Sequence, residues 1–270
     1  MSGPRTLRIF AKGNVDVRDS LLWSRVNGRL EWNGLNQVLR EQKLGATARL
    51  QHETAIAFDF IPLPGHDAAP MPPDIAAMLP APKAHPFEKQ HQSDLFAGPT
   101  DAVVLSLLPD VMNRQLLHRR SGVRFYAEDE RSWAPEPRAW LLRECENVAP
   151  MSAEASMVSL ERLLDAIDEA LHAPVLIYNL CPILPGERAT SYLGAADSLA
   201  LRMKRFNLAL AELSTGRDFS IVDVERISAF AGASNVKVDL AHFNAEGWRL
   251  IAEEVARILV ERGLLDGVSA

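Results

Sequence analysis

The chain has 270 residues, of which 47% are hydrophobic and 24% charged, with a formal net charge of −6 and a pI near 5.7. This composition is typical of a globular protein with a large core, and its acidity argues against nucleic acid or an anionic membrane as a partner. Cys145 and Cys181 show no C-x-x-C spacing, and no His or carboxylate cluster has metal-ligand spacing, so we expect neither metal nor cofactor. The N-terminal run is too short for a signal or membrane-spanning segment, which predicts a cytoplasmic protein.

Four short apolar runs predict buried strands at residues 6–11, 101–108, 173–180 and 219–224. Runs of this kind are typical of parallel sheets that are covered on both faces. Helical periodicity follows in residues 157–171, 199–213 and 245–259, the last with Asn244 as its expected N-cap. The order predicts an α/β fold: a doubly wound, mostly parallel sheet flanked by helices, a flavodoxin-like three-layer sandwich in one domain over residues 1–270.

A proline-rich insert interrupts this alternation at residues 61–100, which hold nine of the 17 prolines. Such a segment cannot form an interior strand or a long helix. It predicts an irregular excursion over the edge of the sheet, either a lid or a surface loop without function.

The segment D-L-A-H-F-N-A-E-G-W carries the sharpest functional signal. Asp239 and His242 are three residues apart, directly before a predicted helix. A carboxylate that binds one ring nitrogen fixes the tautomer of the imidazole and stabilises its protonated form, as a catalytic base requires. On spacing alone, two residues that cap a helix are the alternative.

This segment, continued as R-L-I-A-E-E-V, resembles the closing block of the SGNH (GDSL-type) hydrolases, which is D-x-x-H followed by a polar residue, Gly and an apolar helix. The strand order and the run P-V-L-I-Y-N-L-C-P are also similar to that family, over roughly residues 100–262. The resemblance implies a fold for acyl-ester cleavage or transfer, with a serine nucleophile near the end of the first strand.

The N-terminal part departs from the family, which carries Gly-Asp-Ser directly after the first strand. This chain has K-G-N-V-D-V-R-D-S-L there, which allows two registers. In one, Val15 stands in place of the nucleophile. In the other, Ser20 is the nucleophile after a longer loop. We favour Ser20, because Asp-Ser-Leu is retained and a hydroxyl is the simplest partner for His242. A helix N-cap is the alternative role for Ser20.

The oxyanion-binding block departs as well. Where the family has Gly-x-Asn-Asp, this chain has L-L-P-D-V, and Pro109 has no N–H to donate. The backbone near Ser20 and the amides of Asn14 and Asn33 are the candidate oxyanion donors, and Asp16 and Asn14 are candidate pocket residues in either register.

Three functions are consistent with these residues. The first is an esterase or thioesterase that uses Ser20, His242 and Asp239. The second is an acyltransferase with the same residues. Both act on a small-molecule or carrier-bound acyl substrate. The third is a binding or scaffold protein that has kept the fold and lost the nucleophile, as Val15 and Pro109 suggest.

Overall fold

The computed structural model describes residues 5–26, 29–66, 72–78, 89–183, 185–186 and 197–265. Its centre is a parallel sheet of five strands in the order β10-β9-β5-β1-β4. These strands are β1 (Arg5–Gly13), β4 (Ala46–Thr54), β5 (Ala102–Ser106), β9 (Val175–Tyr178) and β10 (Ser220–Val222). The order matches the 2-1-3-4-5 pattern of flavodoxin-like sheets, which confirms the predicted fold class.

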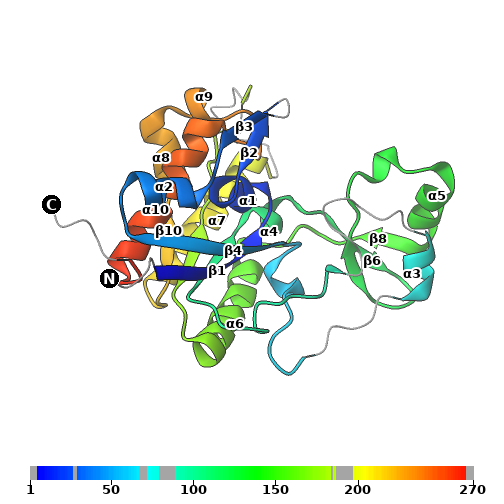
Figure 1. Cartoon of the computed structure of the whole chain (residues 1–270). Helices are drawn as coiled ribbons and strands as arrows, with labels where there is room; N and C mark the ends of the chain where they lie inside the picture. The colour runs from blue at the N-terminus through cyan, green and yellow to red at the C-terminus, as the bar shows by residue number, and fades with distance from the viewer. Residues whose placement is uncertain are drawn as a thin grey trace.

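Helices cover both faces of the sheet (Figure 1). One face packs against α1 (Val15–Leu21), α2 (Leu35–Glu41) and α10 (Ala245–Glu261), with α8 (Val224–Ala231) and α9 (Ala233–Val236) beside α10. The other face packs against α6 (Ala153–Leu171) and α7 (Leu199–Ser214). In β1, Ile9 and Phe10 point into opposite apolar clusters, so both faces of the strand are buried. This explains the unbroken apolar run.

The three predicted helices are confirmed as α6, α7 and α10. Each begins at a polar cap whose side chain accepts a backbone N–H of the first turn. Ser152 caps α6, Ser198 caps α7, and the predicted cap Asn244 accepts the N–H of Gly247 at 3.0 Å. Among the described helices, none is long and apolar enough to cross a membrane.

The edge strand β4 was not predicted, because polar residues such as Arg49 and Glu53 interrupt its apolar pattern. The side chain of Asn36 on α2 covers part of the exposed edge: its Nδ2 donates to the carbonyl of Ala48 at 2.8 Å, and its Oδ1 accepts the Ala48 N–H at 2.7 Å. Pairing with another chain at this point is thereby blocked.

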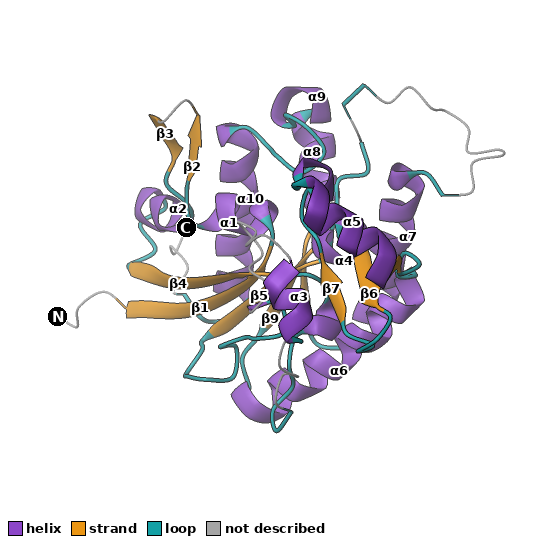
Figure 2. Cartoon of the chain, turned by 90° about the vertical axis from the view of Figure 1, so that its right-hand side faces the viewer, coloured by secondary structure: helices purple, strands orange, loops and turns teal. Residues whose placement is uncertain are grey.

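A second, antiparallel sheet forms a lobe at the side of the main sheet (Figures 1 and 2). Its strands are β6 (Gln115–His118), β7 (Arg124–Tyr126) and β8 (Cys145–Asn147), accompanied by α3 (Pro73–Met78) and α5 (Pro135–Glu144). The lobe has its own apolar cluster around Phe125, Trp140 and Ile75. A short hairpin of β2 (Ser24–Val26) and β3 (Arg29–Trp32) precedes α2. Neither feature was predicted.

The described parts of the proline-rich insert contact both this lobe and the main sheet. Ile75 of α3 is buried in the lobe cluster. The side-chain amide of Gln90 accepts the N–H of Tyr126 and donates to its carbonyl, both at 2.8 Å, as a strand neighbour would. Leu95, by contrast, is buried in the core beside the main sheet. Residues 67–71 and 79–88 lie outside the described residues, and a lid function stays a prediction.

A buried carboxyl group links the main sheet to α6. Asp110, in the short helix α4 (Leu108–Met112), accepts hydrogen bonds from Ser156 Oγ at 2.9 Å and from the Phe58 N–H at 3.0 Å. Burial raises its pKa to about 7, although these two hydrogen bonds act in the opposite direction. The folded protein therefore binds a proton at Asp110 more tightly than the unfolded chain does.

We predict that Asp110→Asn removes part of the pH dependence of stability. Since the pKa of Asp110 is raised on folding, its contribution is present at acidic pH and is lost as the pH rises from about 4 to about 7, at up to about 1.4 kcal/mol per unit. The unfolding free energy of Asp110→Asn minus that of wild type should therefore become more positive as the pH rises over this range, and it should level off above pH 7. Urea titrations from pH 4 to 8 measure it. The exposed Asp168→Asn is the control, and a constant difference between Asp110→Asn and wild type would contradict the assignment.

Candidate active site

Parallel strands end at the same edge of a sheet, and ligands of such folds bind there, near the point where the strand order reverses. Here β1 ends at Gly13 and β5 at Ser106, on the two sides of that point, with Tyr178 at the end of the neighbouring β9. Residues that follow these strands are therefore the ones to consider for chemistry.

Asp239 and His242 are in contact, as predicted. Both carboxylate oxygens of Asp239 lie 2.9 Å from Nδ1 of His242. One of them also accepts the backbone N–H groups of Ala241 and His242, each at 2.9 Å. Burial acts to raise the pKa of Asp239, but these N–H groups and the imidazole outweigh it, so the pKa lies below its ordinary value. The carboxylate is thus held in its ionised form.

This arrangement assigns the two nitrogens of the imidazole. An ionised Asp239 accepts a hydrogen bond from the Nδ1–H group, so in the neutral ring Nε2 carries the lone pair. Among the described residues, none forms a hydrogen bond with Nε2, and the hydrogen bonds of the ring are those of Nδ1. The side chains of His242 and Asp239 are 45% and 55% exposed, so the pair lies at the surface of the protein.

The pair lies in a turn whose ends are fixed by backbone hydrogen bonds. Lys237 and Phe243 form an isolated antiparallel bridge. The N–H of Val238 donates to His242 O at 2.9 Å, and the N–H of Asn244 donates to Val236 O at 2.8 Å. The turn of residues 237–243 is therefore joined to the start of α10, so the position of the imidazole follows from the packing of that helix.

Ser20 lies elsewhere than predicted. Its side chain is fully buried in α1, its Oγ donates to the carbonyl of Asp16 at 2.6 Å, and it lies 3.0 Å from the Tyr178 hydroxyl. No hydrogen bond joins Ser20 to His242 among the described residues. A buried hydroxyl inside a helix cannot reach a substrate carbonyl, so the structure does not support Ser20 as the nucleophile. The physical reason is that residue 20 falls on the inner face of α1.

The first register of the N-terminal block fits the observed helix better. Asn14 stands at the N-cap of α1, directly after β1, and Val15 is its first residue. Val15 thus stands where the resembled family carries its serine, and a valine has no nucleophile. Pro109 lies within α4, after β5, and cannot donate a hydrogen bond.

The other predicted pocket residues, Asp16 and Asn33, lie in different environments. Asp16 is buried, accepts the Asn14 N–H at 3.1 Å and accepts a short hydrogen bond from Ser106 Oγ. Burial raises its pKa above the ordinary range, against the effect of the Ser106 hydrogen bond. Asn33 is exposed, with its N–H directed to Gln37 Oε1 at 3.3 Å. An oxyanion role for Asn14 or Asn33 stays a prediction.

A small cavity of about 20 Å³ lies between Asp16 and the turn of residues 237–243, which carries His242. Its walls include Asp16 from α1, Tyr178 and Asn179 from the end of β9, and Lys237 and Ala241 from the turn. Three segments far apart in sequence therefore meet at the carboxyl edge. Sequence analysis missed Ser106, Tyr178 and Lys237, because each is an ordinary residue until the topology brings it to this edge.

Comparison with known proteins gives structural relatives only. No family model matches the chain, and no curated protein sequence matches it. An acetylxylan esterase from Geobacillus stearothermophilus superimposes with a TM-score of 0.51 at 11% identity, over 95% of each chain. An aryl esterase from M. smegmatis gives 0.49 at 14% identity, over 96% of this chain and 100% of that one. A member of the lipolytic G-D-S-L family from Veillonella parvula gives 0.48 at 11%, over 94% and 98%.

The chain has the SGNH-hydrolase fold. The fold implied by the closing block is thereby confirmed. A fold can serve several functions, so the chemistry has to be argued from the residues of the site.

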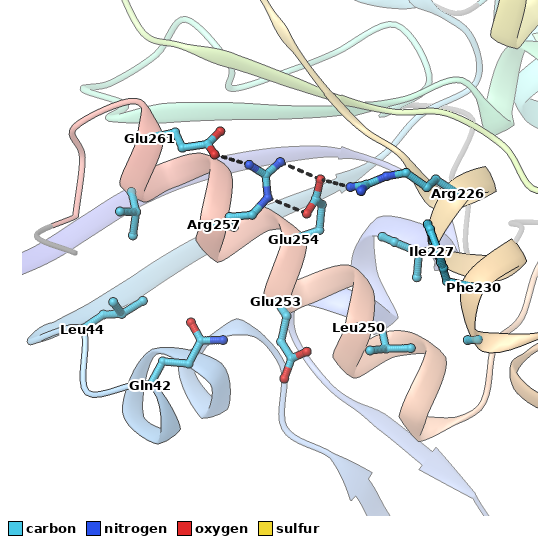
Figure 3. Close-up of a pocket in the computed structure, with 12 residues that line it drawn as sticks. Gln42, Leu44, Arg226, Ile227, Phe230, Leu250, Glu253, Glu254, Arg257 and Glu261 are labelled. Atoms are coloured by element: carbon cyan, nitrogen blue, oxygen red, sulfur yellow. Dashed lines mark hydrogen bonds and ion pairs between the residues drawn. The ribbon is translucent and has the colours of Figure 1, made fainter. Parts of the chain in front are cut away.

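A groove of about 1050 Å³ lies between α10, α8 and the end of α2 (Figure 3). On its wall, Glu254 of α10 binds Arg257 of the same helix at 2.7 Å and Arg226 of α8 at 3.0 Å, and Arg257 also pairs with Glu261. Neither Asp239 nor His242 is among the residues that line it, and none of its lining residues belongs to the segments directly after β1, β5 or β9. The groove is therefore not part of the candidate site.

In the described part of the chain, no three His, Cys, Asp or Glu side chains gather in a way that could hold a metal ion. Cys145 and Cys181 are both buried and free.

We predict that Ser20 and Tyr178 act as a structural pair. Tyr178→Phe should lower the unfolding free energy by about 1 kcal/mol, because it removes the buried hydrogen bond between the two hydroxyl groups. Ser20→Ala should lower it by at least as much, because it also removes the hydrogen bond to the Asp16 carbonyl. The double variant should show a coupling of about 0.5–1 kcal/mol in denaturant titrations. A fluorophosphonate probe should not label Ser20, because the side chain is inaccessible. Labelling at Ser20, mapped by peptide mass spectrometry, would restore it as a nucleophile.

Proposed function

We propose that this chain is an acyl-ester hydrolase in which the Asp239–His242 dyad is the general base. The contact between the Asp239 carboxylate and Nδ1 of His242, whose side chain is 45% exposed, is the observation that carries the proposal. The SGNH fold that the chain shares with an acetylxylan esterase supports the same class of reaction.

The nucleophile that best fits this site is water. Val15 offers no hydroxyl and Ser20 is buried, whereas Nε2 can accept a proton from a water molecule. The water oxygen forms a bond to the acyl carbon as its proton passes to Nε2. The tetrahedral intermediate then breaks its bond to the alcohol oxygen, which takes the proton from Nε2. Acid and alcohol are released, and the imidazole is neutral again.

The ionised Asp239 has two roles in this sequence. It holds the ring with Nε2 outward, and its negative charge stabilises the imidazolium that exists between the two proton transfers. The backbone N–H groups of Ala241 and His242 fix the carboxylate, so neither role depends on a flexible side chain.

Binding without catalysis is the second candidate function. It is favoured by Val15 at the start of α1 and by Pro109 in place of an amide donor. The dyad would then recognise an acyl or carboxylic ligand. Acyl transfer to an alcohol or a carrier remains a third possibility from the sequence, and trapping of acyl product on an added alcohol tests it.

We predict that His242→Ala lowers the release of p-nitrophenol from p-nitrophenyl acetate by about 10²–10⁴-fold, the contribution of a general base. Asp239→Asn should also lower the rate of p-nitrophenol release, because an amide cannot stabilise the imidazolium. Ser20→Ala should keep wild-type turnover when corrected for its folded fraction. Initial rates on purified protein measure all three.

The outcomes separate the candidates. Equal rates for His242→Ala and wild type would refute the hydrolase proposal and leave binding as the function. Loss of activity in Ser20→Ala, with the folded fraction unchanged, would instead support the acyl-enzyme mechanism expected from the sequence. His172→Ala, at an exposed histidine after α6, is the matched control and should retain wild-type turnover.

A further inference from the structure

We propose that Lys237 is a positioning residue for the base, so that its ammonium group fixes the turn carrying His242 against the segment that follows β9. This inference rests on the proposed hydrolysis, in which the location of Nε2 determines the rate. It concerns a residue that is neither in the dyad nor in contact with the imidazole.

Lys237 stands at the point where the base-bearing turn closes. Its backbone N–H donates to Ala233 O at 2.9 Å, which ends α9, and its backbone pairs with Phe243. Phe243 in turn packs against Trp248 of α10, with ring centroids 5.1 Å apart. Both ends of the turn are therefore attached to helices, whereas Asp239 and His242 lie between those ends.

The side chain of Lys237 makes the link to the sheet. Its Nζ donates to the carbonyls of Cys181 at 3.0 Å and of Ile183 at 3.1 Å. These two carbonyls flank Pro182, in the segment that leaves the carboxyl end of β9. The same Nζ lies 5.7 Å from the centre of the Phe243 ring. One ammonium group thus contacts both the β9 segment and the closing residue of the turn.

An ammonium group suits this place better than other side chains. It carries three N–H donors, and two carbonyl oxygens converge on it. Burial lowers the pKa of Lys237, and the nearby Cys181 and Asp239 oppose that shift. A methionine of similar length would leave both carbonyls without this donor, whereas an arginine could still reach them with two N–H groups.

A small cavity of about 20 Å³ adjoins this link, with Lys237, Cys181 and Asp16 among its walls. The turn therefore has some free space beside it, between the end of β9 and α1. Without the ammonium bridge, the turn could shift toward this space and carry Nε2 with it. Displacement of a catalytic group by about 1 Å can cost about 10²-fold in rate.

The test compares Lys237→Met, Lys237→Arg and the exposed control Lys89→Met in the full-length chain. With p-nitrophenyl acetate, we expect Lys237→Met to lower kcat about 10–100-fold with little change in KM, because the base is misplaced while substrate contacts remain. Lys237→Arg should recover part of kcat, and Lys89→Met should match wild type. A loss that follows the folded fraction alone would mean that Lys237 only stabilises the fold.

Hydrogen exchange gives a readout that does not depend on turnover. In Lys237→Met, the amides of Val238 and Asn244 should exchange faster, because their hydrogen bonds close the turn, while the amides in the middle of α10 keep their protection. Unchanged exchange at both amides together with wild-type kcat would overturn the inference. Should Lys237→Met fail to fold, the same comparison with Lys237→Arg and Lys237→Gln decides, since Gln retains a donor and loses the charge.

The two proposals fail in different ways. Wild-type turnover in His242→Ala refutes the hydrolysis, whatever Lys237 does. A large loss in His242→Ala combined with wild-type kcat and exchange in Lys237→Met refutes only the role of Lys237.

Discussion

The contact between the Asp239 carboxylate and Nδ1 of His242 depends on the packing of α10 more than on the turn itself. Asn244 caps that helix with its side chain, and its backbone N–H closes the turn on Val236. The helix is held by its buried face, where Trp248, Ile251 and Val255 lie in the core that also contains Leu7 and Ile9 of β1. Gly247 allows this closeness, because a Cβ there would lie 2.9 Å from Phe243. The orientation of the imidazole is therefore a consequence of core packing.

Core packing also explains why the side chain of Ser20 is buried. In a helix, residues four apart lie on one face, and both Asp16 and Ser20 belong to the buried face of α1. There the serine hydroxyl satisfies a backbone carbonyl and meets the Tyr178 hydroxyl, both deep in the protein. Asp16, one turn earlier, reaches Ser106 at the end of β5. The hydroxyl groups of Ser20, Ser106 and Tyr178 thus join α1 to the neighbouring strands. The water nucleophile of the proposed mechanism follows from the burial of these groups.

Sequence patterns predicted the parts of the fold that burial determines. The strands with both faces in the core and the three long amphipathic helices were predicted within a few residues, and so was the Asp239–His242 contact, because three-residue spacing before a capped helix constrains it. The edge strand β4 and the three- and four-residue strands of the lobe were missed, because they are short or half exposed. Ser20 was misjudged since a linear motif does not reveal which face of α1 it occupies. Lys237 and Cys181 are 56 residues apart, and their contact requires the topology.

The proposed mechanism uses a general base without a serine nucleophile, and this sets a limit on its rate. A positioned general base contributes about 10²–10⁴-fold. Enzymes with a complete triad gain more from the covalent step and from dedicated oxyanion donors, each worth about 10²–10³-fold. Pro109, directly after β5, cannot supply such a donor. A dyad of this kind is suited to esters with good leaving groups, where expulsion of the alcohol needs little help. An acceleration far above 10⁴-fold on an unactivated ester would therefore require a second catalytic group beyond Asp239 and His242.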